Sequence, residues 1–314
     1  MHFVLFQDES TYPHIRNQTS AEGGFTVIYR LLALNIDGTL LRSNGRLQPS
    51  TREAIHYVQK KGVYVTLVTS RHFQTAKKLA KALKINNILI THSGAFISDK
   101  VDRSFYENRI SEEKTFNLVQ VLETFDCNVR IVHERFSLGN RKKVSSNIVG
   151  KTLLSPTDPL FYPVQFVDSL GENLRDEPLS APKMEVYFSE EHECQEVEKV
   201  LSDAFEGITI RVKNPTVLEI TAKGVSKVNG LRLLGQHLNI LPEEMVAIGD
   251  ADDDKEMIEM AGLGVAMGNA PNHVKKAADW ITRNNDDQGV SYMVKEHFRK
   301  QHRIEFLDKL KVDR

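Results

Sequence analysis

The chain alternates short, continuous apolar runs with longer segments in which apolar residues recur at helical spacing. The apolar runs are Leu31–Leu34, Val63–Val68, Ile88–Ile90, Met245–Ile248 and Leu263–Met267. Runs of this length, interrupted only by Thr66, are typical of strands that are buried on both faces of a parallel sheet. Polar residues follow each run within two positions, so the pattern predicts strands that carry polar side chains at their carboxyl ends.

Helical patterns separate the first runs. Pro49 opens one of them, and Ser50 precedes Glu53 by three positions, which predicts a capping box at the start of a helix. Gly62 ends this helix, and a second helix is predicted over residues 73–83. The regular alternation of strand and helix predicts an α/β fold with a doubly wound parallel sheet.

The pattern changes near Ile110. Strand-like pieces at 128–132, 183–188, 209–212 and 217–220 then alternate with helix-like pieces at 112–124 and 191–204. These strands lack the polar motifs that end the first ones, and the first pattern resumes at Ala222. We therefore predict a separate α+β unit that is inserted into the parallel-sheet domain.

Composition limits the class of protein. A chain of 314 residues suits two domains. Lysine and arginine number 41 against 42 for aspartate and glutamate, so no overall field attracts nucleic acid or an anionic membrane. Cys127 and Cys194 are too few for a disulfide framework, and no apolar run has the length of a bilayer. We expect a soluble cytoplasmic protein with neither a nucleic-acid nor a membrane partner.

Residues 1–26 fit this organisation poorly. They have neither the layout of a signal peptide nor the arginine-rich bias of a transit peptide. Glu22-Gly23-Gly24 can be encoded by a purine run of the ribosome-binding type, and Val27 can be encoded by the alternative start codon GTG. Two interpretations stay open: translation starts at Val27, or residues 1–26 are a natural extension.

The polar motifs follow strands that are far apart in sequence. Asn35-Ile36-Asp37-Gly38-Thr39 follows the first strand, Thr69-Ser70-Arg71 the second, and Ser93-Gly94 the third. Gly249-Asp250 begins an acidic run that ends at Asp254. Open α/β sheets place their chemistry at the carboxyl ends of the strands, so these motifs are the candidate site.

Taken together, the motifs resemble those of the haloacid dehalogenase superfamily, and their spacing is similar to that of the Cof-type sugar-phosphate phosphatases. The resemblance extends from about Leu31 to about Tyr292. It implies a Rossmann-like core in residues 27–110 and 221–314, with an α+β cap inserted at 111–220. The first strand of this family ends in Asp-x-Asp-Gly-Thr, whereas the first of these positions is Asn35 in this chain.

The resemblance also implies roles for single residues. Asn35 stands at the position of the nucleophile, and Asp37 at that of the general acid and base. Thr69, Ser70 and Lys227 would bind the phosphate. Lys223 lies close enough in sequence to be confused with Lys227, but Lys227 occupies the matching Ser-Lys position.

A metal and a substrate region follow from the same resemblance. Mg²⁺ would be bound by Asn35, the backbone oxygen of Asp37, Asp250 and Asp254, because a hard cation selects oxygen ligands. Further substrate contacts are expected at Ser93, Gly94 and Asn269. This chain departs from the family pattern at Ser93 and at Asp253, which both replace an asparagine.

Asn35 leaves two hypotheses open. In the first, the protein is a magnesium-dependent phosphohydrolase that acts on a small phosphorylated metabolite such as a sugar phosphate. In the second, it is a catalytically weak descendant that binds such a metabolite as a sensor or scaffold. A neutral amide oxygen is a poor nucleophile, which favours the second, while the retained Asp37, Thr69 and Lys227 favour the first. The sequence identifies neither the substrate nor the oligomeric state.

Overall fold

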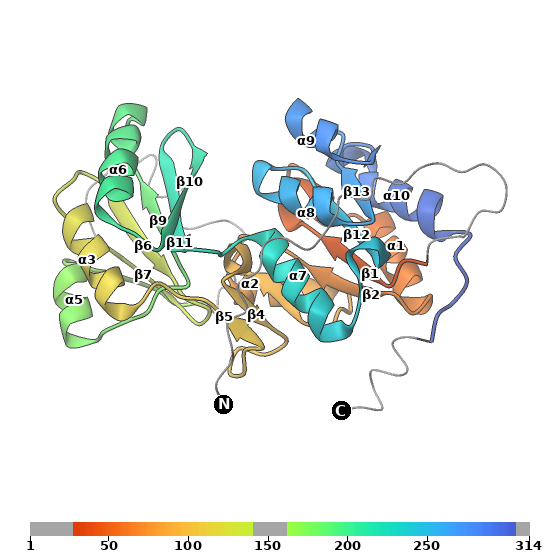
Figure 1. The fold of residues 1–314 in the computed structure, drawn as a ribbon, viewed down its shortest axis with the longest axis horizontal. Helices are drawn as coiled ribbons and strands as arrows, with labels where there is room; N and C mark the ends of the chain where they lie inside the picture. The colour runs from red at the N-terminus through yellow and green to blue at the C-terminus, as the bar shows by residue number, and fades with distance from the viewer. Residues whose placement is uncertain (1–27, 141–161, 306–314) are drawn as a thin grey trace.

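The computed structural model describes residues 28–140 and 162–305. The N-terminal extension discussed above, residues 1–26, lies outside the described residues. The described chain forms two bodies, a core and a cap, each with its own sheet and helices (Figure 1). Within the described ranges, no helix combines the length and the apolar character that crossing a bilayer requires.

The core is built on a five-stranded parallel sheet with the strand order β14-β13-β12-β1-β2. Its strands are β1 (Leu31–Leu34), β2 (Tyr64–Leu67), β12 (Met245–Gly249), β13 (Leu263–Ala266) and β14 (Trp280–Ile281). The first strand of the chain therefore pairs with β12 on one side and β2 on the other. Every residue of β1 is fully buried, as the continuous apolar pattern predicts.

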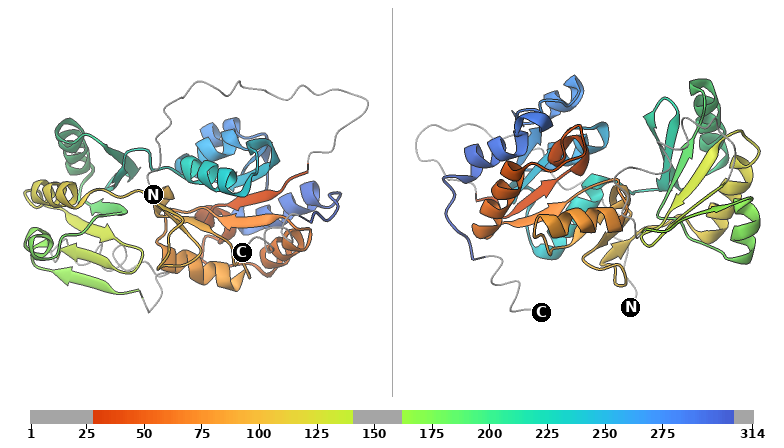
Figure 2. Two further views of the ribbon diagram at one scale, coloured as in Figure 1. Left: turned by 60° about the horizontal axis from the view of Figure 1, so that its bottom comes forward. Right: turned by 180° about the vertical axis from the view of Figure 1, so that it is seen from behind.

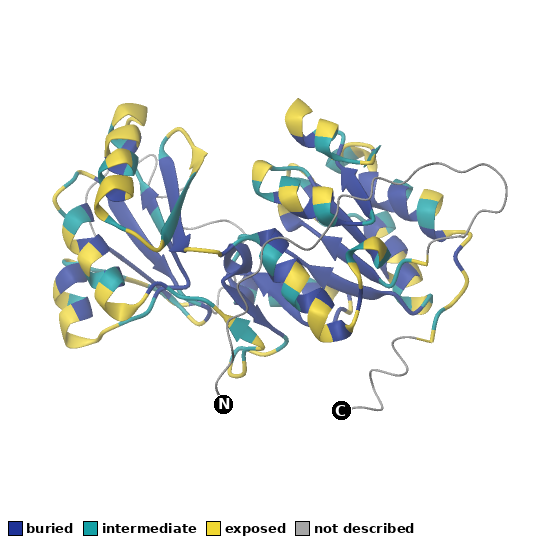
Figure 3. Cartoon of the chain, viewed as in Figure 1, coloured by how far each residue is buried: buried dark blue, intermediate teal, exposed yellow. Residues whose placement is uncertain are grey.

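Helices cover both faces of this sheet, as Figure 3 shows by burial. One layer contains α1 (Pro49–Lys60), α2 (Phe73–Ala82) and α10 (Gly289–Phe298), and the other contains α7 (Lys227–Leu238) and α8 (Lys255–Met260). The short helix α9 (Asn272–Ala277) packs beside α8. The predicted doubly wound α/β fold is confirmed.

The start of α1 differs from the prediction. The helix begins at Pro49, and the capping residue is Gln48, whose side chain makes no capping hydrogen bond. The predicted capping box of Ser50 and Glu53 is therefore wrong. Proline itself defines the first helical position, because its fixed φ suits the first turn and its missing N–H needs no partner there.

The third strand also differs. β3 (Leu89–Thr91) pairs antiparallel with β4 (Phe96–Ser98), which pairs with β5 (Tyr106–Glu107). β3 meets the edge of the parallel sheet through a bridge between Val68 and Ile90 and the hydrogen bond from the Thr69 N–H to the Ile90 carbonyl. The Thr66 hydroxyl of β2 also donates to the Ile88 carbonyl, just before β3. The chain beyond the third motif thus turns back at the sheet edge and leads to the cap.

The cap has a six-stranded sheet in the order β10-β11-β9-β6-β7-β8. Its elements are α3 (Glu112–Leu122), β6 (Asn128–Val132), β7 (Ser137–Asn140), β8 (Val164–Val167), α5 (Leu170–Asp176), β9 (Lys183–Tyr187), α6 (Glu191–Ala204), β10 (Ile208–Asn214) and β11 (Val217–Ala222). The three helices pack on one face, away from the core (Figures 1 and 2). β11 extends two residues past 220, and the precise domain boundaries stay a prediction.

The opposite face of the cap sheet is polar and meets the core. Cross-strand neighbours place Arg130, Glu185, Glu219 and Arg211 in one row across four strands. The Ser93 hydroxyl of the core donates to Glu219 over 2.8 Å. The cap therefore presents charged side chains toward the carboxyl ends of the core strands, where the candidate site lies.

Candidate functional site

The turn after β1 brings the first motif next to the acidic loop. Gly38 has a φ of +68°, a conformation that glycine adopts without strain. A Cβ atom at this position would collide with the Asp250 carboxylate. The glycine thus permits both the turn and the close approach of Asp250, whose Oδ1 accepts a hydrogen bond from the Thr39 hydroxyl over 2.7 Å.

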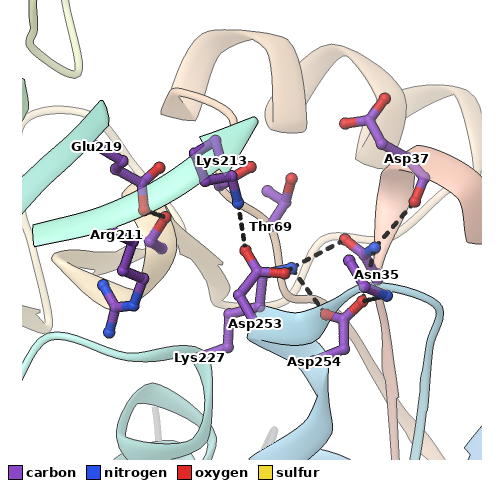
Figure 4. A network of polar contacts seen from close by, with 12 residues as sticks. Asn35, Asp37, Thr69, Arg211, Lys213, Glu219, Lys227, Asp253 and Asp254 are labelled. Carbon is purple, nitrogen blue, oxygen red and sulfur yellow. Dashed lines mark hydrogen bonds and ion pairs between the residues drawn. The ribbon is translucent and has the colours of Figure 1, made fainter. Parts of the chain in front are cut away.

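Asn35 lies at the centre of the site and is 4% exposed. Its Nδ2 is 2.9 Å from the Asp37 carbonyl oxygen, 3.1 Å from Asp250 Oδ1 and 3.0 Å from Asp254 Oδ2. Its Oδ1 accepts from the Ile36 N–H over 2.8 Å. Figure 4 shows the amide between Asp37 and Asp254. The side chain at the nucleophile position is therefore fully engaged with the protein.

Lys227 is buried beside this amide. It is the first residue of α7, which Ser226 caps by accepting from the Asn229 N–H. Its Nζ donates to Asp254 Oδ1 over 2.7 Å, to Asp253 Oδ1 over 3.0 Å and to Asn35 Oδ1 over 3.4 Å. Burial lowers the lysine pKa, but the two aspartates outweigh it, so the pKa is raised and the ammonium stays charged.

The acidic loop is held by its own backbone. The Asp254 Oδ2 accepts from the N–H groups of Asp250 and Ala251, over 3.0 and 3.1 Å. Burial raises the pKa of the Asp250 carboxyl to about 6, and the charge of Asp254 acts in the same direction. Burial acts on Asp253 as well, but the ammonium groups of Lys227 and Lys213 hold its pKa well below the usual range.

The second motif connects to the first through an arginine. Thr69 is fully buried, and its Oγ1 accepts from the Arg71 N–H over 3.1 Å. The Arg71 guanidinium in turn binds the Asp37 carboxylate, which is the more exposed partner. One connected polar group thus lies at the carboxyl ends of β1 and β2 and the start of α7, and it consists of Thr69, Arg71, Asp37, Asn35 and Lys227.

Other predicted residues lie at the edge of this group. The Ser70 carbonyl accepts from Lys183 of the cap over 2.8 Å, and Ser93 is bound to Glu219. Gly94 has a φ of +104°, and its Cα faces the Ser226 carbonyl too closely for any Cβ. Ser70, Ser93 and Gly94 therefore lie where the cap meets the core.

Asn269 supports the first motif from the far side. Its Nδ2 donates to the Gly38 carbonyl over 2.9 Å, and its Oδ1 accepts from the Asn285 N–H over 3.0 Å. It lies 3.5 Å from Asp250 Oδ2. Asn269 thus contacts both the Gly38 turn and the Asp250 carboxylate.

Sequence reasoning assigned no role to Arg71, Lys213 and Lys183. Arg71 is part of the second motif, Thr69-Ser70-Arg71, so its place near the site could be read from the sequence. Lys213 Nζ donates to Asp253 Oδ2 over 2.8 Å, although 40 residues separate the two. No local pattern marks a lysine in a cap hairpin as a partner of a core loop. Its contact depends on how the cap meets the core.

The metal ligands predicted from the resemblance do not fit a cation as they are arranged here. The Asp37 carbonyl and Asp250 Oδ1 both accept hydrogen bonds from the Asn35 Nδ2. An amide nitrogen has no lone pair available for a metal, and Mg²⁺ requires oxygen ligands. Within residues 28–140 and 162–305, no group of three or more His, Cys, Asp or Glu side chains is arranged to hold a metal ion.

Comparison with known proteins agrees with the fold and the motifs. Residues 32–294 match the model of the haloacid dehalogenase-like hydrolases. The chain is 55% identical over 285 residues to the stress response protein YhaX of Bacillus subtilis strain 168, covering 91% of this chain and 99% of the relative. It is 30% identical over 270 residues to the 5-amino-6-(5-phospho-D-ribitylamino)uracil phosphatase YcsE of the same organism, covering 85% and 94%.

A solved structure gives the same result. The crystal structure of a haloacid dehalogenase-like hydrolase from Bacteroides thetaiotaomicron superposes with a TM-score of 0.76 at 27% identity, covering 85% of this chain and 99% of that one. Relatives named as phosphatases support a phosphatase, and the family predicted from the sequence is confirmed. The chain belongs to the haloacid dehalogenase-like hydrolase family.

Proposed function

We propose that this protein is a phosphohydrolase that acts slowly on a small phosphorylated metabolite such as a sugar phosphate. The connected group of Thr69, Arg71, Asp37, Asn35 and Lys227 carries this proposal. It joins a buried ammonium, a buried hydroxyl and a half-exposed carboxylate at the ends of the core strands. The relative YcsE, named for a phosphorylated ribityl compound, supports a substrate of this kind.

In the proposed hydrolysis, each residue of the connected group has its own role. Lys227 neutralises the phosphoryl oxygens, and Thr69 with the N–H groups that precede α2 binds them. Once Arg71 has released the Asp37 carboxylate, this carboxylate takes a proton from the attacking water and passes it to the leaving oxygen. Since Asn35 offers only an amide oxygen, water must attack phosphorus in place of a carboxylate. Loss of a covalent nucleophile lowers turnover on the order of a millionfold, or about 8 kcal/mol in the barrier.

Magnesium dependence, which the resemblance implies, is not part of this proposal for the wild type. The amide at Asn35 occupies the oxygens that would bind the ion. No step of the reaction is therefore assigned to a metal, and activity is expected to be low with or without Mg²⁺.

The test is an assay of phosphate release from a panel of phosphate esters, with wild type beside Asn35→Asp, each in Mg²⁺ and in EDTA. We expect Asn35→Asp to raise turnover by several orders of magnitude in Mg²⁺. Asn35→Asp with Asp37→Asn is the matched control and should lose this gain. Wild-type turnover equal to that of Asn35→Asp would show that another group attacks phosphorus.

A second function, as a sensor or scaffold that binds a phosphorylated metabolite, is favoured by the hydrogen bonds of Asn35. Without a carboxylate at this position, less negative charge repels a bound phosphate. The relative YhaX carries the name of a stress response protein, which also suits such a role. Calorimetric titration with the same esters distinguishes the two functions: saturable binding without phosphate release supports the sensor, and Lys227→Met should abolish that binding.

A further inference from the structure

The Asn35 amide has one orientation that is compatible with all of its neighbours. The three groups near Nδ2 are oxygen acceptors, and the two near Oδ1 are the Ile36 N–H and the Lys227 ammonium, which are donors. Rotating the amide by 180° would place its oxygen against three oxygens and its hydrogens against two donors. The chemistry of the neighbours therefore fixes the amide with its N–H bonds toward the acidic loop.

Two of the oxygens that receive these N–H bonds are the Asp37 carbonyl and Asp250 Oδ1. A cation bound by both would lie about 2 Å from each, directly against the positive end of the amide dipole. If the amide rotated, its oxygen would give the cation only a neutral ligand. The hydrogen bonds that Oδ1 accepts from Ile36 and Lys227 would then be lost. Both effects oppose binding of Mg²⁺.

The carboxylates of the loop are already compensated by protein groups. The carboxylate of Asp254 is fully buried. It accepts hydrogen bonds from the Lys227 ammonium, from two backbone N–H groups and from the Asn35 amide. Asp253 lies between Lys227 and Lys213 of the cap. Asp250 receives the Thr39 hydroxyl and the amide. No carboxylate of this loop depends on a metal ion for a partner in this arrangement.

We propose that the Asn35 carboxamide takes the place of a metal ion in this protein. It links the first strand to the acidic loop through hydrogen bonds, so the wild type folds with an ordered site and has no Mg²⁺ requirement. Replacement of the amide by a carboxylate creates the cation site and, with it, a dependence on the cation. This inference concerns metal binding alone and does not depend on whether the protein hydrolyses a phosphate ester.

The test measures thermal unfolding and calorimetric binding of Mg²⁺ on the full-length chain after treatment with EDTA, without any phosphate ester. For the wild type we expect no rise in melting temperature and no saturable heat across a Mg²⁺ series. Asn35→Asp should melt below wild type in EDTA, because three carboxylates then meet without the amide donor. Mg²⁺ should raise its melting temperature by roughly 5 °C or more.

Matched variants locate the effect. Asn35→Asp with Asp250→Asn should lose the Mg²⁺ response, since it removes a ligand while keeping the new carboxylate. Saturable Mg²⁺ binding by the wild type that Asp250→Asn abolishes would overturn the proposal. An Asn35→Asp protein that folds without any Mg²⁺ response would overturn it too. If Asn35→Asp does not fold, the wild-type titration beside Asp250→Asn decides, since it requires no change at Asn35.

Discussion

Arg71 holds both carboxylate oxygens of Asp37. Its Nε donates to Oδ2 over 2.7 Å and its Nη2 donates to Oδ1 over 2.5 Å, a bidentate pair. The Asp37 side chain is 55% exposed, so water competes with the arginine. A carboxylate engaged in this way cannot reach the oxygen of a leaving group, so this pair must open before Asp37 can transfer a proton.

Opening this pair by mutation should increase turnover. In the Asn35→Asp background, we expect Arg71→Gln to raise kcat severalfold, because both oxygens of Asp37 become free. Stability should change by less than about 1 kcal/mol, since the pair is partly exposed. Steady-state kinetics and urea unfolding measure the two effects. A fall in kcat with a large rise in KM would indicate instead that Arg71 binds the phosphate.

Lys227 should be essential for stability as well as for phosphate binding. Lys227→Met leaves Asp253 and Asp254 buried without their shared ammonium, and loss of one partner from a buried ion pair costs about 3 kcal/mol. We expect a clear fall in the urea midpoint. Lys223→Met, at an exposed lysine four residues earlier, is the control and should unfold like wild type. Equal midpoints for the two variants would contradict the ion pairs described here.

Thr69 should affect ligand binding more than folding. Thr69→Val removes the acceptor of the Arg71 N–H and a hydroxyl beside the proposed phosphate position. We expect inorganic phosphate to bind roughly tenfold more weakly or worse in calorimetry. Thr66→Val is the matched control, because Thr66 lies in β2, the strand that leads to Thr69, and donates to the Ile88 carbonyl instead. The idea fails if both valine variants bind phosphate equally well.

Acid should destabilise the cap through Glu185. Burial raises the pKa of this carboxyl, but Lys183 and Arg130 outweigh it and lower the pKa from 4.5 to about 2. A folded-state pKa below the unfolded value gives stability that is present above about pH 4.5 and is lost as the pH falls toward 2. The contribution is at most about 3 kcal/mol.

The corresponding variant is Glu185→Gln. We expect it to be less stable than wild type at neutral pH and to lose less stability on acidification, measured by urea unfolding across that pH range. Glu196→Gln, at an exposed position of α6, should follow the wild-type profile. Parallel profiles for wild type and Glu185→Gln would exclude Glu185 as the titrating group.

The elements that sequence predicts well are those with a strong local pattern. The predicted strand at Asn128–Val132 and the predicted helix at Glu191–Ala204 match β6 and α6 residue for residue. β7 was missed because its four residues include a single apolar side chain, Leu138, so no alternating pattern marks it, and β8 is equally short. β4 turns back against β3 through the short turn His92–Gly94, a reversal that the pattern of the third motif did not predict.

For the candidate site, the motifs predicted which residues lie in it but not the hydrogen bonds and ion pairs between them. The Lys227 and Asn35 positions follow from the family pattern, and the structure places Nζ and Oδ1 3.4 Å apart. The direction of the Asn35 amide depends on Asp250 and Asp254, more than 200 residues away. Likewise, the motif marks Asp253 only as a departure from the family pattern, and its contact with Lys213 depends on the position of the cap.

The position of β1 between β2 and β12 also determines the order in which the chain folds during synthesis. Ala33 pairs with Thr66, which leaves the ribosome early, and with Ala247, which leaves it only after the whole cap sheet has ended at Ala222. Domains generally fold as units as they emerge. We expect stalled nascent chains to resist protease in the cap before the core. Until β12 has been synthesised, one edge of the apolar strand β1 has no neighbouring strand. A chaperone that binds exposed apolar segments would act mainly in this period.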